Sequence, residues 1–250
     1  MAARDRLRLS ISVDQVAVLR NARGNDWPDP LRAALLAEAS GADGISARLR
    51  ADRRDLSEGD IEALAAGLGI PLHLNAAPTP AMLGLLTRLR PASCCLVAEA
   101  PDGSRADICL DILADEPGLR AAISTLRGAG TRPALLIGHA RAEIEAAARS
   151  GAQIVVFHTG AYSIAHAEGR QDEADREICA LHAAAVLATG LGLEAHAAHG
   201  LTYENIDPVA AIPELREVHI GHFLIGEAVY IGLGPAIEEM RRRIDAACQW

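Results

Sequence analysis

The chain contains no lysine, since all 24 of its basic residues are arginines. This absence excludes catalysis through a lysine Schiff base and excludes the P-loop, whose motif requires a lysine. Aromatic residues make up only 3% of the 250 residues, so the core must be built from aliphatic side chains. With few aromatics to stack on bases and a net charge of −9, the chain is not expected to bind nucleic acid.

Long hydrophobic runs and a cysteine framework are also missing. No apolar run approaches the roughly 18 residues that span a bilayer, and the N-terminus lacks the apolar segment of a signal peptide. The five cysteines form no CxxC motif, and Cys94 and Cys95 are adjacent, a spacing that rarely gives a relaxed disulfide. We therefore expect a cytoplasmic protein with reduced cysteines and no membrane partner.

What the chain does contain is an alternation of short apolar runs with helical patterns. Helical stretches with apolar spacing near 3.6 separate the runs, which is typical of parallel strands joined by right-handed crossovers. Eight such units in about 250 residues predict one (β/α)8 TIM barrel domain over residues 1–250, with extra helices; an open doubly wound sheet is the alternative. The expected strands are residues 6–14, 43–49, 70–76, 93–98, 132–138, 153–159, 193–199 and 217–222.

Polar residues near the carboxyl ends of these strands are the candidates for chemistry, because reactive groups of such barrels gather there. A polar side chain inside a strand costs free energy unless it is paired or used. Alternation with a period of two predicts which of them point inward. The inward set is Ser10, Ser12, Asp14, Ser46, Arg48, Arg50, His73, Asn75, His158, His199 and His222.

Two glycine motifs, HGLTYEN (199–205) and IGH (220–222), predict a phosphate site. Gly200 and Gly221 each end a short apolar run, so a ligand can approach the main-chain N–H groups without meeting a Cβ. Arginines, whose planar fork suits phosphate oxygens, crowd the first two strand ends. We expect a phosphorylated small metabolite as the ligand. These arginines are Arg20, Arg23, Arg50, Arg53 and Arg54.

The histidines permit two interpretations. His199 directly precedes the glycine turn and is the candidate proton donor, with a packed core histidine as the alternative. The pairs His196/His199 and His219/His222 have HxxH spacing, but residues i and i+3 of a strand point to opposite faces. Without a bulge neither pair can chelate, so we expect no metal and no cofactor.

Several motifs together resemble one enzyme family, pyridoxine 5′-phosphate synthase. They are VDQVAVLRNARG (13–24), GADGI (41–45), LRADRR (49–54), CCLV (94–97), HTG (158–160), HGLTYEN and IGH, and they cover nearly the whole chain in order. The resemblance implies a cytosolic TIM barrel that assembles as a homo-oligomer, typically an octamer. It also implies joining of 1-deoxy-D-xylulose 5-phosphate to 3-amino-2-oxopropyl phosphate, which closes the pyridine ring of vitamin B6. The amine comes from the aminoketone, so no lysine is needed.

The resemblance also assigns roles by motif. It implies that the pentulose phosphate contacts Asp14, Arg50 and one of Arg53 or Arg54, and that His199 is the general acid. The aminoketone phosphate would be held by Arg23, Gly200, Gly221 and His222.

Departures from the family pattern fall on the chemistry. Arg48 stands where the family has a histidine that accepts a proton, and Asn75 and Val156 stand where it has glutamates. Asparagine cannot accept the proton, and arginine stays protonated. Elsewhere in the site, Ser12, Gln15 and Arg105 replace an asparagine, a histidine and a threonine of the family.

These departures leave three functions open. We favour an enzyme that keeps the aminoketone-phosphate pocket and condenses or cyclises its ligand with a more anionic second substrate, drawn by Arg48 and Arg105. His73 and His196 are then the candidates for replacement proton transfer, although either could be a packed core histidine. A genuine pyridoxine 5′-phosphate synthase with relocated bases and a non-catalytic phosphometabolite-binding barrel are the alternatives.

Overall fold

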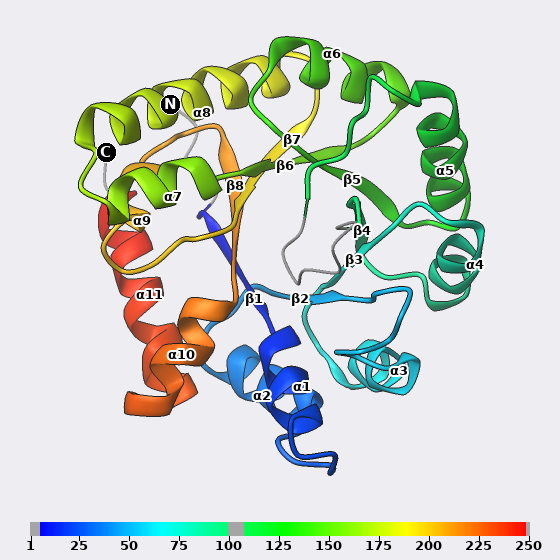
Figure 1. Cartoon of the computed structure of the whole chain (residues 1–250), viewed down its shortest axis with the longest axis vertical. Helices are drawn as coiled ribbons and strands as arrows, with labels where there is room; N and C mark the ends of the chain where they lie inside the picture. The colour runs from blue at the N-terminus through cyan, green and yellow to red at the C-terminus, as the bar shows by residue number, and fades with distance from the viewer. Residues whose placement is uncertain (1–5, 100–107, 249–250) are drawn as a thin grey trace.

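A closed barrel of eight parallel strands forms the centre of the molecule (Figure 1). The computed structural model describes residues 6–99 and 108–248. The strands pair in chain order and β1 closes the barrel against β8, which confirms the predicted (β/α)8 fold. The strands are β1 (Arg8–Ser12), β2 (Gly44–Arg48), β3 (Leu72–Ala76), β4 (Ser93–Leu96), β5 (Arg132–Ile137), β6 (Ile154–His158), β7 (Glu194–Ala198) and β8 (Leu215–Ile220).

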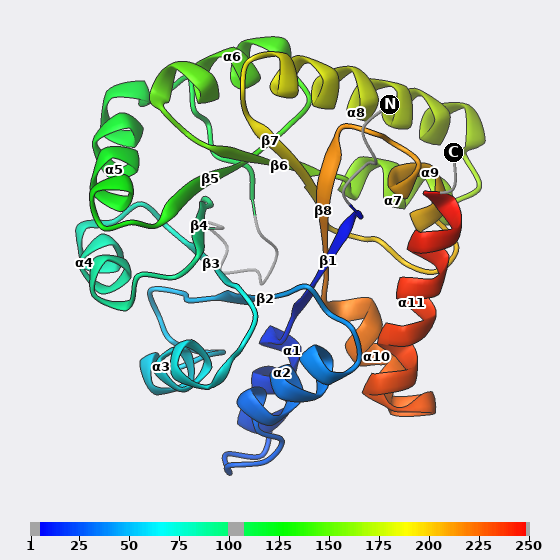
Figure 2. The same ribbon diagram turned by 180° about the vertical axis from the view of Figure 1, so that it is seen from behind.

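Helices surround the barrel on its outside, as the views from both sides show (Figures 1 and 2). Several begin at residues that favour a helix start: Pro30 and Pro80 follow capping side chains, and Ser57 forms a capping box with Asp60. The helices are α1 (Asp14–Asn21), α2 (Pro30–Ala39), α3 (Glu58–Gly67), α4 (Pro80–Leu89), α5 (Glu116–Gly128), α6 (Arg141–Ser150), α7 (Gly160–Ala167), α8 (Gln171–Gly190), α9 (Ile206–Ala210), α10 (His222–Ile231) and α11 (Leu233–Ala247).

Each of the eight expected strands differs from the observed one by one or two residues at one end or both, and the differences in the first and last strands affect the site. The first strand ends at Ser12, and Asp14 is the first residue of α1, where a carboxylate interacts favourably with the helix dipole. The last strand begins at Leu215 and ends at Ile220, so Gly221 and His222 belong to the start of α10. Both corrections move candidate site residues from a strand to a helix N-terminus.

The interior of the barrel is divided into an apolar half and a polar half. A cluster of small and branched side chains, among them Cys95, Leu136 and Val156, fills the side formed by β4 to β7. Buried polar residues lie on β1, β2, β3, β7 and β8, among them Ser10, Ser46, His73, His196 and Glu217. A much larger apolar core lies between the sheet and the helices. The apolar layers stabilise the barrel, and the polar half is where function can reside.

A register shift between β7 and β8 places the polar residues of β8. Ala195 pairs with Leu215 whereas His196 pairs with Glu217, so Arg216 is an extra residue on β8. Glu217 and His219, two residues apart, then share the interior face. Among the residues that the structure describes, no helix is both long enough and apolar enough to cross a bilayer.

Candidate active site

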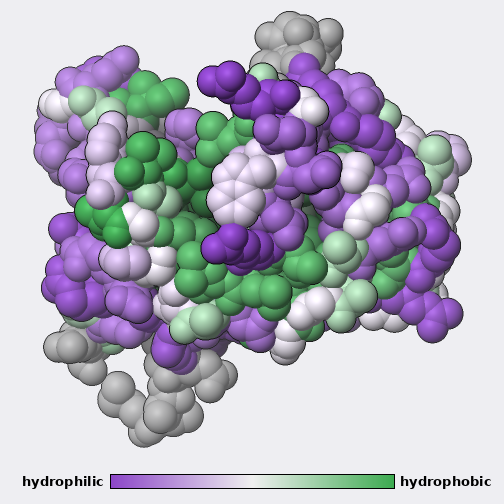
Figure 3. Space-filling view, turned by 90° about the horizontal axis from the view of Figure 1, so that it is seen from below, coloured by the Kyte–Doolittle hydropathy of each residue, from purple (hydrophilic) through white to green (hydrophobic). Residues whose placement is uncertain are grey.

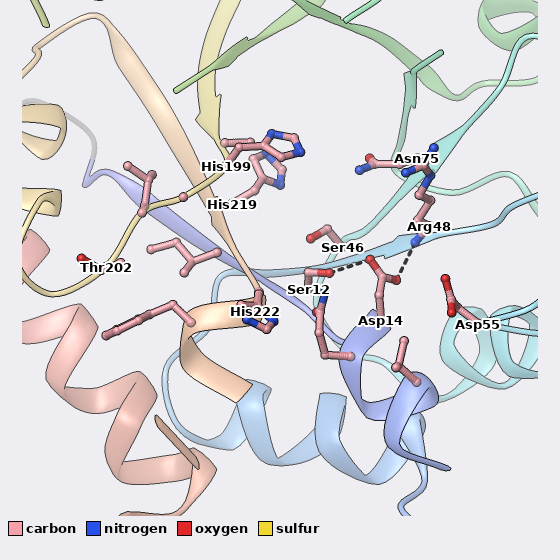
Figure 4. A pocket seen from close by; sticks show the side chains of 18 residues that line it. Ser12, Asp14, Ser46, Arg48, Asp55, Asn75, His199, Thr202, His219 and His222 are labelled. Carbon is pink, nitrogen blue, oxygen red and sulfur yellow. Dashed lines mark hydrogen bonds between the residues drawn. The ribbon is translucent and has the colours of Figure 1, made fainter. Parts of the chain in front are cut away.

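A pocket of about 360 Å³ opens at the carboxyl ends of β1, β2, β3, β7 and β8 (Figure 4). This is the end of a TIM barrel at which catalytic residues lie. Many of the residues expected at the site line this pocket. They are Ser12, Asp14, Gln15, Arg48, Asn75, His199, Gly200, Gly221 and His222.

Asp14 organises one wall of the pocket. Its Oδ1 accepts a hydrogen bond of 2.7 Å from the backbone N–H of Arg48, and its Oδ2 accepts one of 2.8 Å from the Ser12 hydroxyl (Figure 4). The carboxylate therefore ties the start of α1 to the ends of β1 and β2. This wall is held by charge-assisted bonds, which are stronger than neutral ones.

Arg48 and Asn75 form a neighbouring wall and pair in register across β2 and β3. Arg48 is buried, and its guanidinium lies 3.4 Å from the carbonyl oxygen of Ala98. Figure 4 shows the two side chains next to each other in the pocket. A buried cation and an amide here favour an anionic ligand group, because both can donate hydrogen bonds to it.

His199 lies at the opposite side in a backbone conformation that L residues rarely adopt. Its φ is 88°, in the left-handed region, and such strain gathers at functional sites. Its carbonyl accepts a hydrogen bond of 2.5 Å from the Thr159 hydroxyl. The His158 ring stacks on the His199 ring with 4.2 Å between centroids, and the Gly160 N–H donates to His158 Nδ1. His158, one of the expected site residues, thus supports the His199 ring.

Two glycines frame the part of the pocket suited to a phosphate. Gly200 is exposed at φ 72°, and the Asn205 side chain braces its loop by donating to Gly200 O and accepting from the Thr202 N–H. Gly221 is the N-cap of α10, and no side chain of residues 6–99 or 108–248 caps this helix. The first N–H groups of such a helix are available to an anion.

The arginines expected to clamp phosphate lie elsewhere. Arg20 forms a bidentate ion pair with Asp60, at 2.6 and 2.8 Å, which ties α1 to α3. Arg53 binds Glu58 at 2.6 Å. Arg23, Arg50 and Arg53 are not among the described residues that line the pocket. Arg23 is exposed in the turn after α1, and Arg50 is buried. Arg105 lies outside the described residues.

His73 and His196 line a second, smaller cavity of about 30 Å³ within the barrel. Asn75, Ala198, His199 and His219 line both cavities, so the smaller one adjoins the larger. Burial lowers the pKa of His219 to about 3. Burial works to raise the pKa of Glu217, but the surrounding histidines, His73 first, hold it well below its ordinary value. The buried cluster therefore contains a carboxylate beside a neutral imidazole.

Comparison with known proteins identifies the family. The family model described as pyridoxal phosphate biosynthesis protein PdxJ matches residues 9–246. The chain belongs to the PdxJ family. The pyridoxine 5′-phosphate synthase of Cereibacter sphaeroides (strain ATCC 17029) is 51% identical over 242 residues, which cover 97% of this chain and 96% of that one. The synthase of Ruegeria pomeroyi is 48% identical over 241 residues, covering 96% and 97%.

Two similar solved structures are each less than 25% identical to this PdxJ-family chain, so they bear on its fold alone. Phosphoribosyl anthranilate isomerase from Thermus thermophilus aligns with a TM-score of 0.60 at 18% identity, covering 96% of this chain and 99% of that one. Thiamine phosphate pyrophosphorylase from Pyrococcus furiosus aligns with a TM-score of 0.62 at 11% identity, covering 97% and 98%. Both likenesses support the TIM barrel assigned above.

Three polar pocket residues of this PdxJ-family chain escaped the sequence reasoning as ligand-binding candidates: Asp55, Thr202 and His219. Thr202 lies inside the HGLTYEN motif, so its place there could have been noticed. Asp55 follows the second strand's arginine run by one residue, a weaker signal. His219 was considered only as half of an HxxH pair, because its neighbours on other strands cannot be seen in the sequence.

Proposed function

We propose that this PdxJ-family chain binds a phosphorylated aminoketone of the 3-amino-2-oxopropyl phosphate type. We further propose that it condenses or cyclises this ligand with a second, anionic substrate. The proposal rests on one observation: Arg48 and Asn75 line the pocket at positions where the family resemblance expects proton acceptors. A cation at that wall favours a carboxylate-bearing partner over a neutral one.

The phosphate arm of the ligand fits the glycine-framed side. Gly200, Gly221 and the N-terminus of α10 offer main-chain N–H groups beside His222, and these residues line the same pocket as Arg48. An aminoketone bound there by its phosphate extends toward Arg48 and Asn75. Its own amine supplies the nitrogen for condensation, which agrees with a chain that has no lysine.

His199 is the proposed proton-transfer residue. It lines the pocket between the glycine-framed side and the barrel interior, and the stacked His158 ring supports its imidazole. Three histidines were expected to move protons. His199 lines the larger pocket as well as the smaller cavity, whereas His73 and His196 line the smaller cavity.

A binding and turnover panel tests this proposal. The protein is screened by thermal shift against inorganic phosphate, aminoketone phosphates and sugar phosphates, and then incubated with aminoketone phosphate plus either a neutral or a carboxylate-bearing partner. We expect stabilisation by the aminoketone phosphate and product only with the carboxylate-bearing partner. Arg48→Met should remove that preference, and Arg120→Gln, on an exposed ion pair with Glu116, is the matched control. Stabilisation without turnover in any mixture would instead indicate a phosphometabolite-binding protein.

A genuine pyridoxine 5′-phosphate synthase is the second candidate. The identity of 51% with the Cereibacter sphaeroides synthase over nearly the full length of both chains favours it. In that case Asp14, the carboxylate that Ser12 and Arg48 orient in the pocket wall, becomes the candidate for the missing base. Formation of pyridoxine 5′-phosphate from the two family substrates at an ordinary turnover would establish this function and overturn the first.

We also propose that the chain forms a homo-oligomer, an octamer by family analogy, in the cytoplasm. Exposed apolar side chains support an assembly surface: Val229 and Tyr230, at the end of α10, are 75% and 81% exposed. Figure 3 shows hydrophobic patches between hydrophilic side chains on the molecule seen from below. Sedimentation equilibrium measures the state, and a monomer at micromolar concentration would contradict the proposal.

A further inference from the structure

Three histidines surround one buried carboxylate inside the barrel, beneath the pocket. Glu217 is 1% exposed, and His196, His219 and His73 lie around it. They come from β3, β7 and β8, so they meet through the interior of the barrel and not along one strand. The proposed function uses neither Glu217 nor His219, and a packed apolar core would not require this set.

The separations within this cluster are those of ligands around a metal ion. His196 Nδ1 lies 3.1 Å from His219 Nε2, and His219 Nε2 lies 3.9 Å from Glu217 Oε1. One donor atom from each of His196, Glu217 and His219 lies within 4.8 Å of the others. Ligand atoms of a tetrahedral Zn²⁺ are about 3.3 Å apart, because its bonds to nitrogen and oxygen are about 2.0–2.1 Å long. A small inward adjustment would bring all three to bonding distance.

The groups behind the three candidate ligands orient them as in metal sites. His196 Nε2 lies 2.9 Å from Glu194 Oε1, so it donates outward and presents the lone pair of Nδ1 to the centre. Arg132 in turn holds the other Glu194 oxygen at 2.7 Å. Arg8 Nε donates to Glu217 Oε2 at 2.9 Å, which leaves Oε1 facing the histidines.

Glu217 Oε1 has a further property that points to a ligand. It is fully buried, and among the residues that the structure describes it has no hydrogen bond of good geometry, although His73 Nε2 lies 3.1 Å away. A buried carboxylate oxygen left in this state costs free energy. A cation bonded to Oε1 would remove that cost. His73 would lie beside this cation, and the Ser93 hydroxyl, 2.7 Å from His73 Nδ1, holds the His73 ring in place.

We propose that His196, Glu217 and His219 bind one divalent first-row transition-metal ion, such as Zn²⁺, in the interior of the barrel. Two imidazoles and a carboxylate are a common donor set for such ions. Three protein ligands leave at least one coordination position for a water or a substrate atom. The 30 Å³ cavity that His196 and His219 line, which adjoins the larger pocket, provides room for it.

Sequence reasoning did not consider this cluster, because it paired histidines within a strand. His196 cannot chelate together with His199, and His219 cannot chelate together with His222. His196 of the first pair, however, contacts His219 of the second pair across β7 and β8. Arg8 is the main opposing charge, and it contacts the Glu217 oxygen that is turned away from the centre. The site is independent of the proposed substrates, so its test requires none of them.

The test measures metal binding to tag-free, full-length protein. The protein is stripped with a chelator, titrated with Zn²⁺ by calorimetry, and loaded with Co²⁺ for visible absorption. We expect one equivalent per chain and the spectrum of a four- or five-coordinate cobalt ion without a thiolate charge-transfer band. His196→Asn and His219→Asn should each weaken Zn²⁺ binding at least about 100-fold, and Glu194→Gln about 10- to 100-fold.

A surface histidine gives the matched control. His182 faces Glu214 at 3.2 Å with half of its side chain exposed, and His182→Asn should leave the stoichiometry and the affinity unchanged. The wild-type spectrum alone keeps the proposal falsifiable if the variants fail to fold. The proposal would be overturned by the spectrum of a six-coordinate cobalt ion or by the absence of binding at one equivalent. A thiolate charge-transfer band would also overturn it, because that band would show that a cysteine such as Cys95 binds the ion.

Discussion

Replacing Asp60 with asparagine tests whether the arginine run after the first strand serves the fold or the ligand. Asp60 accepts two hydrogen bonds from Arg20, at 2.6 and 2.8 Å, and two from Ser57 in the capping box of α3, both at 2.8 Å. The Arg20 and Asp60 side chains are only 15% and 13% exposed. Arg20 is on α1, whose first residue, Asp14, lines the pocket. The ion pair is therefore expected to stabilise the scaffold beneath the pocket.

The magnitude follows from these contacts. Hydrogen bonds to charged groups contribute about 1.5–3 kcal/mol, and a helix cap contributes about 1 kcal/mol. Asparagine keeps the shape and part of the cap, so we expect Asp60→Asn to cost about 2 kcal/mol at pH 7. For a domain of this size that lowers Tm by roughly 4–8 °C. Thermal unfolding at one fixed protein concentration measures it.

The effect should depend on pH in one direction. Burial works to raise the pKa of Asp60, but the hydrogen bonds from Arg20 and Ser57 outweigh burial and lower it below the ordinary value. A lowered pKa means that the stabilisation is complete above the unfolded value of about 3.9 and is lost as pH falls through the folded value. The difference in the free energy of unfolding between wild type and Asp60→Asn should therefore be constant near neutrality. It should disappear below about pH 4.

An exposed ion pair on the same helix provides the control. Glu62 binds Arg88 at 2.8 Å, but their side chains are 49% and 59% exposed, so Glu62→Gln should cost no more than about 0.5 kcal/mol. The reasoning fails if Asp60→Asn lowers the free energy of unfolding no more than Glu62→Gln does. It fails equally if the difference in stability between wild type and Asp60→Asn increases in acid. It also fails if Asp60→Asn removes phosphate binding while leaving Tm unchanged, because Arg20 would then belong to the ligand site.

Three further changes probe the pocket. Gly221→Ala would place a Cβ 2.6 Å from Ser12 Cβ, so the start of α10 must shift, and we expect phosphate to bind about 10-fold more weakly in a titration followed by thermal shift. Arg48→Met should weaken binding of a carboxylate-bearing second substrate about 10-fold or more, measured by calorimetry, while phosphate binding is retained. Tyr162→Phe removes a buried 2.8 Å hydrogen bond to Asn205 O and should cost about 1–2 kcal/mol in urea unfolding, with a looser loop around the glycine turn.

For each of these three substitutions, one outcome would contradict the prediction. Gly226→Ala is the control for Gly221→Ala, because Gly226 is on the same helix and no atom lies within 4 Å of its added Cβ. Equal phosphate affinity in the two variants would disprove a phosphate site at Gly221. If Arg48→Met binds neutral and anionic partners as wild type does, the guanidinium does not select charge. Unchanged stability of Tyr162→Phe would show that the loop is held by other contacts.

Local pattern was enough to predict the barrel and most of the pocket wall. Strand and helix periods are set by neighbours a few residues apart, so the alternation along the chain indicates eight strand–helix units without knowledge of their contacts. Parallel strands bring their carboxyl ends to one edge, which is why Ser12, Arg48, Asn75 and His199 could be placed together from their positions alone. The motifs that carry the family resemblance are likewise contiguous stretches of sequence.

Contacts between distant strands were decided only by the closed barrel. Closure sets β1 beside β8, and the extra residue on β8 turns Glu217 and His219 inward. His196 and His219, 23 residues apart, thereby become neighbours, and Arg20 reaches Asp60, 40 residues away. Such pairings depend on register, on curvature and on which side chains share the interior, and residue spacing along the chain carries none of that information.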